Sequence, residues 1–134
     1  MKLDLSSLEK AITQLTQGLR LAAQQPASDL LRDGVIQRFE YTYEVSWKSL
    51  KRFLESTSSD PQAIDTLAFA DLIRLGHERG LLRSSYDVWA VFRKARGTTS
   101  HTYDQKKAEE VYQTVPGFLE EARYLLERLQ SSSS

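Results

Sequence analysis

The chain has 134 residues, with 18 Lys and Arg against 18 Asp and Glu, a formal net charge of zero and no cysteine. The absence of cysteine excludes disulfides, thiolate metal sites and a cysteine nucleophile, and the zero net charge argues against a protein that binds polyanions with its whole surface. Because no segment approaches the ~18 apolar residues of a membrane span, and the first residues are unlike a secretory leader, we expect a cytoplasmic protein that does not enter the membrane.

The first part of the chain predicts two long helices. Apolar residues recur in steps of three and four over residues 5–22, and Ser6 followed by Glu9 has the spacing of a capping box, which marks a helix start. A second apolar stripe begins near Ser28 and stops at the Ser, Thr, Asp and Pro cluster of residues 56–61.

Two shorter helices and a long final helix follow. We expect the short helices over roughly residues 65–78, with Gly80 as the stop signal, and over roughly residues 85–96. The final helix has the most regular pattern, over residues 108–129, and Asp104 is its expected N-cap.

The final pattern continues in phase through Pro116, which predicts one helix with a kink at the proline. Residues 131–134 are expected to form a disordered polar tail, and no alternating strand pattern is present. The sequence therefore predicts an all-α protein, an antiparallel bundle of four or five helices that forms a single domain over residues 1–130.

The sequence predicts no metal and no cofactor. A carboxylate-bridged metal bundle uses Glu-x-x-His pairs, and neither His77 nor His101 has an acidic residue three positions before it. Glu40 and Glu44 share a helical face, but Glu44 also precedes Lys48 by four residues, which is the spacing of a surface ion pair. We therefore interpret this face as solvated. No glycine spacing matches a dinucleotide-binding or phosphate-binding loop.

The zero net charge conceals one basic segment. Residues 93–107 contain five basic residues and one acidic residue, a formal charge of +4, so the other 119 residues must sum to −4. Gly97 and the hydroxyl residues after it predict a helix break directly after Arg96. Such a break can turn the side chains of Arg96 and His101 toward one pocket.

An arginine beside a histidine suits the cleavage of a phosphodiester in RNA. The imidazole transfers protons near neutral pH, the guanidinium binds the developing charge on phosphate, and RNA supplies its own 2′-hydroxyl nucleophile. Two proton-transfer groups are ideal, so a homodimer would supply the second histidine. Arg93 and Lys94 are candidates for further phosphate contacts.

In the alternative interpretation, Arg96 and His101 only cap helix ends, and Tyr103 is a partly buried tyrosine at a helix start.

The aromatic residues of the second helix fall into two groups. Phe39, Tyr43 and Trp47 follow the apolar stripe and are expected in the core. Tyr41 and Lys48 lie off that stripe, so they are candidates to face a partner.

These residues resemble the HEPN superfamily, and within it the short all-α nucleotidyltransferase substrate-binding proteins, which are the HEPN half of HEPN/MNT pairs. Residues 39–51, FEYTYEVSWKSLK, are similar to the signature second helix of that family. Arg96-x4-His101-x-Tyr103 is similar to its R-x4-H-x-Y motif, and the resemblance extends over residues 5–129.

The resemblance implies a HEPN-like bundle that dimerises and brings two R-x4-H motifs into one cleft. In related toxins this composite site cuts RNA without a metal, and a minimal nucleotidyltransferase antitoxin attaches AMP to the motif tyrosine in some pairs. By this resemblance Arg96 and His101 are the candidate catalytic pair, and Tyr103 is the candidate modification site. One departure is Gly97, which stands where the family usually has a polar residue, often Asn.

Three hypotheses follow. The first is a HEPN-type toxin subunit, a metal-independent ribonuclease that acts as a homodimer and is neutralised by a nucleotidyltransferase that adenylylates Tyr103. The second, favoured by Gly97, is a non-catalytic subunit that presents substrate or a docking surface to a minimal nucleotidyltransferase. The third, favoured by the regular final helix, is a purely structural helical partner.

Overall fold

The computed structural model describes residues 3–133, and every regular element in that range is an α-helix. The helices are α1 (Ser6–Gln24), α2 (Asp29–Ser56), α3 (Pro61–Asp65), α4 (Phe69–Glu78), α5 (Tyr86–Gly97) and α6 (Gln105–Ser133). The predicted all-α bundle is confirmed, with the short α3 as an additional helix. None of the helices in the described range is both long enough and apolar enough to cross a bilayer.

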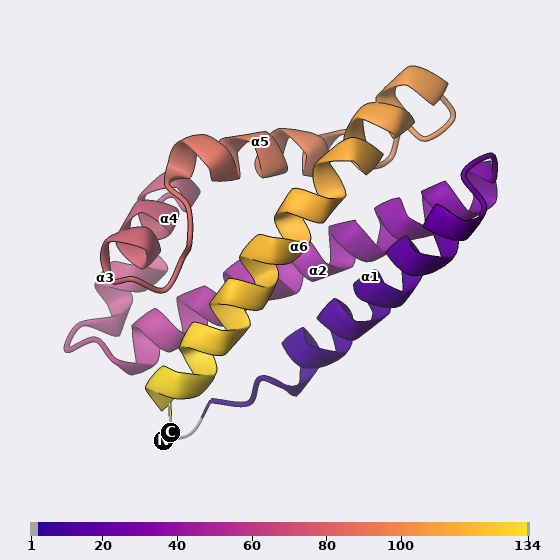
Figure 1. The fold of residues 1–134 in the computed structure, drawn as a ribbon. Coiled ribbons are helices and arrows are strands. Elements are labelled where there is room, and N and C mark those ends of the chain that lie inside the picture. The colour runs from indigo at the N-terminus through magenta and orange to yellow at the C-terminus, as the bar shows by residue number, and fades with distance from the viewer. Residues whose placement is uncertain (1–2, 134) are drawn as a thin grey trace.

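The central element of the bundle is α2, which packs against each of the other helices. A short turn joins α1 to α2, so the two run antiparallel, and α6 crosses both of them (Figure 1). The start of α1 lies beside the end of α6, where the Gln130 side-chain amide donates to Glu9 Oε1 at 2.9 Å. The helix α5 runs back from α4 to the start of α6, which places its C-terminal end over the middle of α2.

Of the two expected helix N-caps, Asp104 is confirmed, and Ser28, near which the second helix was expected to begin, is also a cap. The Ser28 hydroxyl and the Asp104 carboxylate each accept a hydrogen bond, at 3.1 Å, from the backbone N–H three residues later. The capping box at Ser6 is wrong, because Ser6 already lies inside α1. Its backbone N–H and its hydroxyl both donate to the Asp4 carboxylate, at 3.0 and 2.7 Å, and these bonds lower the pKa of Asp4.

The region before α4 differs from the prediction. Residues 65–78 were expected to form one helix, but Asp60 and Pro61 begin the separate α3. The Asp60 carboxylate accepts from the backbone N–H of Ala63 at 3.3 Å, and Pro61 has the fixed φ that suits the first position of a helix. The stretch 56–61 that was expected to be only a turn therefore also contains a helix start.

The end of α4 confirms the predicted stop at Gly80. This glycine has φ of +75°, its N–H donates to the carbonyl of His77 at 3.0 Å, and the N–H of Leu81 donates to the carbonyl of Gly76 at 2.9 Å. This pair of bonds is the Schellman motif. Gly76 also permits close packing, because a Cβ there would lie 2.9 Å from Leu50 Cδ2 of α2.

The final helix confirms that Pro116 lies within one element, since α6 is continuous from Gln105 to Ser133. Residues 131–133, which were expected in a polar tail, continue this helix. Ser134 lies outside the described residues.

An aromatic cluster holds α2, α5 and α6 together around Phe118. The centroid of its ring lies 5.2 Å from that of Phe39, 5.4 Å from Phe92 and 5.9 Å from Trp89. Tyr43 joins the cluster at 6.0 Å. All five side chains are buried, which confirms the core positions predicted for Phe39 and Tyr43.

The core position predicted for Trp47 is confirmed only in part, because this side chain is partly buried and packs against the edge of the core. Trp47 is partly exposed, packs edge-on against Phe69 with the ring centroids 6.0 Å apart, and donates from Nε1 to Glu44 Oε2 at 3.1 Å. It lies on the core stripe in the C-terminal half of α2, where the ring that it contacts, Phe69, belongs to the short α4. Trp47 therefore offers part of its ring to the surface.

Candidate functional site at the end of α5

Arg96 lies in the last turn of α5 and points back to two carboxylates of α2. Its Nε donates to Glu44 Oε1 at 3.2 Å, and its Nη2 lies 3.6 Å from Glu40 Oε1. The hydroxyl of the buried Thr99 donates to Glu40 Oε2 at 2.6 Å and lies 3.4 Å from Arg96 Nη1. Since Glu40 and Glu44 are four residues apart, one helical face presents both carboxylates to the guanidinium.

This contact corrects the interpretation of Glu40 and Glu44 as a merely solvated face. Their side chains are only 41% and 32% exposed, and they hold a guanidinium that is 33% exposed. The expected ion pair between Glu44 and Lys48 is present, with Lys48 Nζ 3.9 Å from Glu44 Oε2. The sequence shows that Glu40 and Glu44 share a helical face, but no local pattern in it predicts that this face contacts Arg96.

His101 and Tyr103 lie in the turns between α5 and α6. His101 Nδ1 is 3.2 Å from Tyr103 Oη, and the two rings meet edge-on with their centroids 5.7 Å apart. His101 is partly exposed and Tyr103 is 80% exposed. The alternative in which Tyr103 is partly buried is therefore wrong, and its phenol is open to a partner molecule.

The helix break predicted after Arg96 is confirmed, because α5 ends at Gly97. Arg96 and His101 nevertheless take different partners, and within residues 3–133 no hydrogen bond joins them. Gly97 has no positive φ, and a Cβ on it would meet nothing within 4 Å, so the backbone does not require glycine there.

A cavity of about 420 Å³, here called the arginine cavity, opens beside Arg96. Arg93, Arg96 and Lys51 line it with positive charge, and Glu44 is its one acidic lining residue among those described. The wall also includes Tyr43, and burial raises the pKa of Tyr43 to about 12, which keeps this phenol protonated at neutral pH. The lining residues carry a formal charge of +2, but Lys51 is paired with Asp65 at 3.0 Å and Arg96 with Glu40 and Glu44. Arg93, which has no ion pair among the described residues, and the phenol donor suit an anionic ligand.

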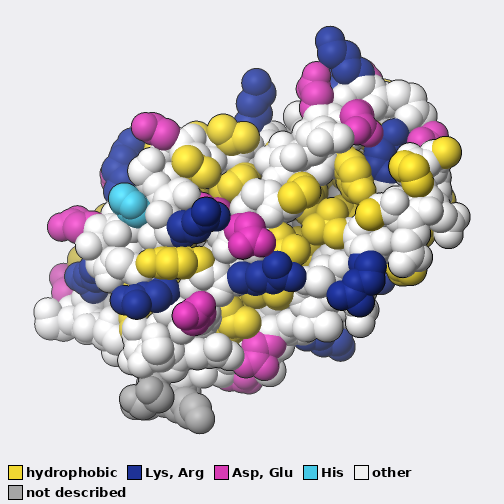
Figure 2. All heavy atoms as spheres, viewed as in Figure 1, with side chains coloured by type: hydrophobic (Ala, Val, Ile, Leu, Met, Phe, Trp, Pro, Cys, Tyr) yellow, Lys and Arg dark blue, Asp and Glu magenta, His cyan; other side chains and the backbone are white. Residues whose placement is uncertain are grey.

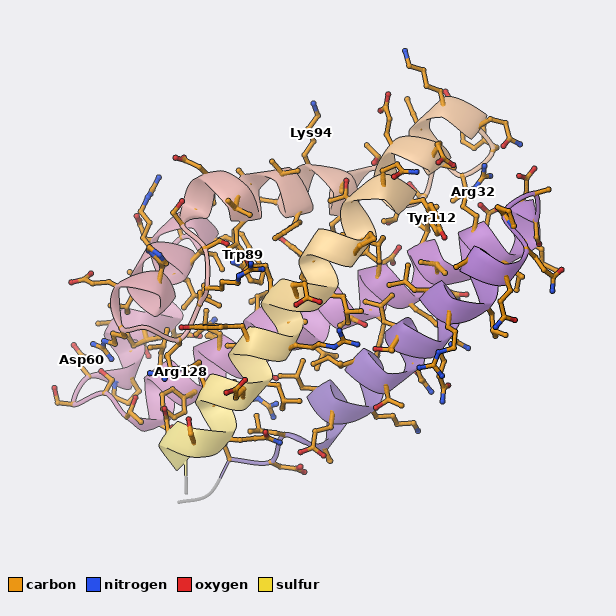
Figure 3. The ribbon with its side chains drawn as sticks, viewed as in Figure 1. Arg32, Asp60, Trp89, Lys94, Tyr112 and Arg128 are labelled. Atoms are coloured by element: carbon orange, nitrogen blue, oxygen red, sulfur yellow. The ribbon has the colours of Figure 1, made fainter. Side chains whose placement is uncertain are left out.

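The two other basic candidates face different surfaces. Arg93 stacks over the Phe69 ring at 4.9 Å from its centroid and lines the arginine cavity. Lys94 points away from the bundle, whereas Trp89 of the same helix points into it (Figure 3). Lys94 instead borders a shallow cavity of about 190 Å³ between α5 and α6. The structure therefore groups Arg93, but not Lys94, with Arg96.

That α5–α6 surface is partly apolar. Val88 and Val91 are 40% and 55% exposed, and Figure 2 shows hydrophobic side chains gathered over α5 and the adjoining part of α6. Thr98, at the start of the turns that carry His101, lines the same shallow cavity. Within the described range, no group of three His, Cys, Asp or Glu residues could hold a metal ion.

Comparisons with known proteins agree over most of the chain. Residues 3–131 match the family model described as nucleotidyltransferase substrate binding protein like. A Haemophilus influenzae protein named probable ribonuclease HepT is 37% identical over 126 residues, which cover 92% of this chain and 85% of that protein.

Two solved structures are similar in fold. One, from Haemophilus influenzae, is described as revealing the fold of a substrate-binding domain of a nucleotidyltransferase. It is 34% identical, has a TM-score of 0.89 and covers 95% of this chain and 99% of its own. The other, from Thermus thermophilus, is 31% identical, has a TM-score of 0.73 and covers 91% of this chain and 98% of its own.

Proposed function

This chain belongs to the nucleotidyltransferase substrate-binding protein-like family, and from that premise we propose that it is a HEPN-type toxin, a ribonuclease that needs no metal. A relative named as a probable ribonuclease supports the proposal. The observation that carries it is that Arg96 lines a cavity with basic residues while His101 lies partly exposed in the turns directly after the same helix. RNA as substrate and a nucleotide-using partner are both consistent with a protein of the cytoplasm.

In the proposed reaction the 2′-hydroxyl of RNA attacks the adjacent phosphorus. The O2′–P bond forms, the P–O5′ bond breaks, and the products carry a 2′,3′-cyclic phosphate and a 5′-hydroxyl. His101 takes the proton from the 2′-hydroxyl or gives one to the leaving 5′-oxygen, and Arg96 binds the nonbridging oxygens as charge develops on them. Glu40 and Glu44 hold the guanidinium in place, which reduces the ordering needed in the transition state.

A homodimer completes this site in our proposal. Each chain contributes one His101 to the turns after α5, whereas acid–base cleavage uses two proton-transfer groups. The exposed Val88 and Val91 give α5 an apolar face, and Thr98 connects that face to the turns. A two-fold contact across this face brings two copies of the 98–104 segment together, because a symmetric interface repeats the same patch from both subunits.

The antitoxin in this proposal is a minimal nucleotidyltransferase that modifies Tyr103. Tyr103 Oη attacks the α-phosphorus of ATP, pyrophosphate leaves, and AMP remains on the phenol. The 80% exposure of Tyr103 supports access by a partner enzyme. Because Tyr103 Oη lies 3.2 Å from His101 Nδ1, the attached AMP places bulk and negative charge directly against the proposed proton-transfer group.

The proposed reaction is tested with purified chain, single-stranded RNA and excess EDTA. Arg96→Ala is expected to abolish cleavage, and Arg83→Ala, which alters an exposed arginine before α5, is expected to retain it. The cleavage products should carry cyclic phosphate ends. Equal cleavage by the two variants, or 3′-hydroxyl products, would contradict the proposal.

A second candidate function is a non-catalytic subunit that presents substrate to the nucleotidyltransferase. It is favoured by Gly97, which provides no side-chain donor after Arg96, and by the separate partners of Arg96 and His101 within one chain. Expression without the nucleotidyltransferase separates the two functions. Growth arrest that disappears with His101→Ala supports the toxin, and unimpaired growth supports the presenting subunit.

A further inference from the structure

We propose that the outer face of α2 carries a second RNA subsite, which binds an unpaired nucleotide next to the arginine cavity. This inference rests on the ribonuclease function proposed above and adds that the substrate is single-stranded where it crosses α2.

The subsite is a cavity of about 510 Å³, here called the α2 cavity. Four of its lining residues, Tyr41, Val45, Lys48 and Arg52, follow one another along α2 in steps of four, three and four, so they form one stripe. At a rise of about 1.5 Å per residue this stripe is about 16 Å long. Its volume lies within the ~300–1,000 Å³ of ordinary ligand sites.

The α2 cavity adjoins the arginine cavity. Trp47 and Lys51 line both of them, so a ligand that follows this surface passes from Arg96 to the α2 cavity across these two side chains. A strand with its cleaved phosphate at Arg96 would place a neighbouring nucleotide over Trp47.

The side chains of the α2 cavity match the chemistry of a nucleotide. Lys48, Lys51 and Arg52 line the cavity beside the carboxylate of Glu55. Lys51 is paired with Asp65 at 3.0 Å and Lys48 lies 3.9 Å from Glu44, so Arg52 is the lining cation that has no ion pair among the described residues. Tyr41 is 54% exposed and provides an aromatic face for a base. Proteins bind single strands through such a combination of basic side chains with aromatic stacking surfaces.

Trp47 is held in a fixed position for stacking. Its ring contacts Phe69, its Nε1 donates to Glu44 at 3.1 Å, and Lys48 Nζ lies 5.6 Å from its centroid. A preset ring loses little conformational entropy when a base binds to it. Glu44 therefore connects the two cavities, because its other carboxylate oxygen accepts from Arg96.

The charge of the α2 cavity favours RNA over a second copy of this chain. A two-fold contact on this face would place Arg52, which has no ion pair among the described residues, from both copies in one interface. Like charges in such an interface oppose association. A polyanion meets no such repulsion.

The test measures binding of fluorescein-labelled decauridylate RNA by fluorescence anisotropy, in a His101→Ala background that prevents cleavage. Tyr41→Ala and Arg52→Glu are each expected to weaken binding about tenfold. Arg52→Glu should also flatten the plot of log affinity against log salt by about 0.7. The matched control is Arg20→Glu, an exposed arginine thirteen residues further along α1 than Ser7 of the α2 cavity, and it should change affinity less than twofold.

Intrinsic fluorescence provides a second readout. Trp89 is fully buried, so RNA that stacks on this face should quench only the emission of Trp47. A duplex of the same length should bind more weakly than the single strand, because its bases are not free to stack.

Three results would overturn the subsite. One is that Tyr41→Ala and Arg52→Glu bind RNA as Arg20→Glu does. Another is that they weaken association with the nucleotidyltransferase while RNA affinity is unchanged, which would make this face a protein docking surface. The third is that the duplex binds as tightly as the single strand.

The failure of the subsite is distinguishable from the failure of the ribonuclease. If the cleavage-competent chain cuts RNA and Tyr41→Ala leaves both kcat and KM unchanged, the subsite is wrong and the ribonuclease function stands. If the chain cuts no RNA but Tyr41→Ala still weakens RNA binding tenfold, the subsite stands and the catalytic function is wrong.

Discussion

Two substitutions of Glu44 test the proposed role of Arg96, because one changes only the charge beside the guanidinium and the other also removes the contact that positions it. Its carboxylate accepts from Arg96 Nε at 3.2 Å and from Trp47 Nε1 at 3.1 Å. Glu44→Gln keeps an acceptor oxygen on this side chain but removes the negative charge. Glu44→Ala removes both the charge and the contact that orients the guanidinium.

The two substitutions should cost little stability. Arg96 and Glu44 are about one third exposed, and pairs of this kind contribute ~0–1 kcal/mol to the free energy of unfolding. Either variant should therefore melt no more than about 5 °C below the unchanged chain.

Their effects on RNA cleavage should differ. Glu44→Gln raises the net charge of the residues lining the arginine cavity from +2 to +3, so KM should fall, by up to about fivefold for ~1 kcal/mol of relieved repulsion. Glu44→Ala leaves the guanidinium less well oriented, so kcat should fall about tenfold.

Steady-state cleavage of a fluorogenic RNA in EDTA measures both parameters. Glu127→Gln is the matched control, because Glu127 is an exposed glutamate of α6 that lines neither cavity. If Glu44→Gln and Glu44→Ala change kcat and KM in the same way, or neither differs from Glu127→Gln, the positioning of Arg96 by this carboxylate is refuted.

Four further outcomes are expected. Phe118→Ala removes the ring at the centre of the aromatic cluster and should lower the free energy of unfolding by about 3–5 kcal/mol in urea titration; a loss below about 1 kcal/mol would contradict the packing. Because the pKa of Tyr43 rises from 10.0 unfolded to about 12 folded, its contribution to stability is complete below pH 10 and is lost as pH rises toward 12, and Tyr43→Phe should make the alkaline decline shallower. Tyr103→Phe should retain RNA cleavage but accept no AMP by mass spectrometry, and persistent labelling would place the modification elsewhere. Gly97→Asn should leave the melting temperature within about 3 °C, since its Cβ enters open space, and a larger fall would show that the site requires glycine.

Helix positions were predictable because local patterns determine them. The three-four spacing of apolar residues places a stripe on each long helix. Ser28 and Asp104 cap the starts of α2 and α6, and Gly80 ends α4, through bonds that span only a few residues. The short α3 was missed because five residues are too few to show a period. The capping box failed because Asp4, upstream of the pair, competes successfully for the N–H of Ser6.

The candidate site was predictable only in part, because its contacts join distant segments. The motif residues Arg96, His101 and Tyr103 were found from local composition and resemblance. The carboxylates that hold Arg96 come from α2, 52 residues away in the case of Glu44, and depend on how α5 crosses that helix. Lys94 is adjacent in sequence to Arg93, but the helical rotation of about 100° per residue places it on a different surface.

The two histidines of the chain provide the most direct test of the proposed ribonuclease. His101 lies in the proposed site, whereas His77 is an exposed residue in the last turn of α4 and serves as the matched control. The measurement is the rate of RNA cleavage at neutral pH in EDTA by the unchanged chain, His77→Ala and His101→Ala. We predict equal rates for the first two and a loss of at least about 100-fold for His101→Ala. Equal cleavage by both variants, or no cleavage by the unchanged chain, would contradict the account.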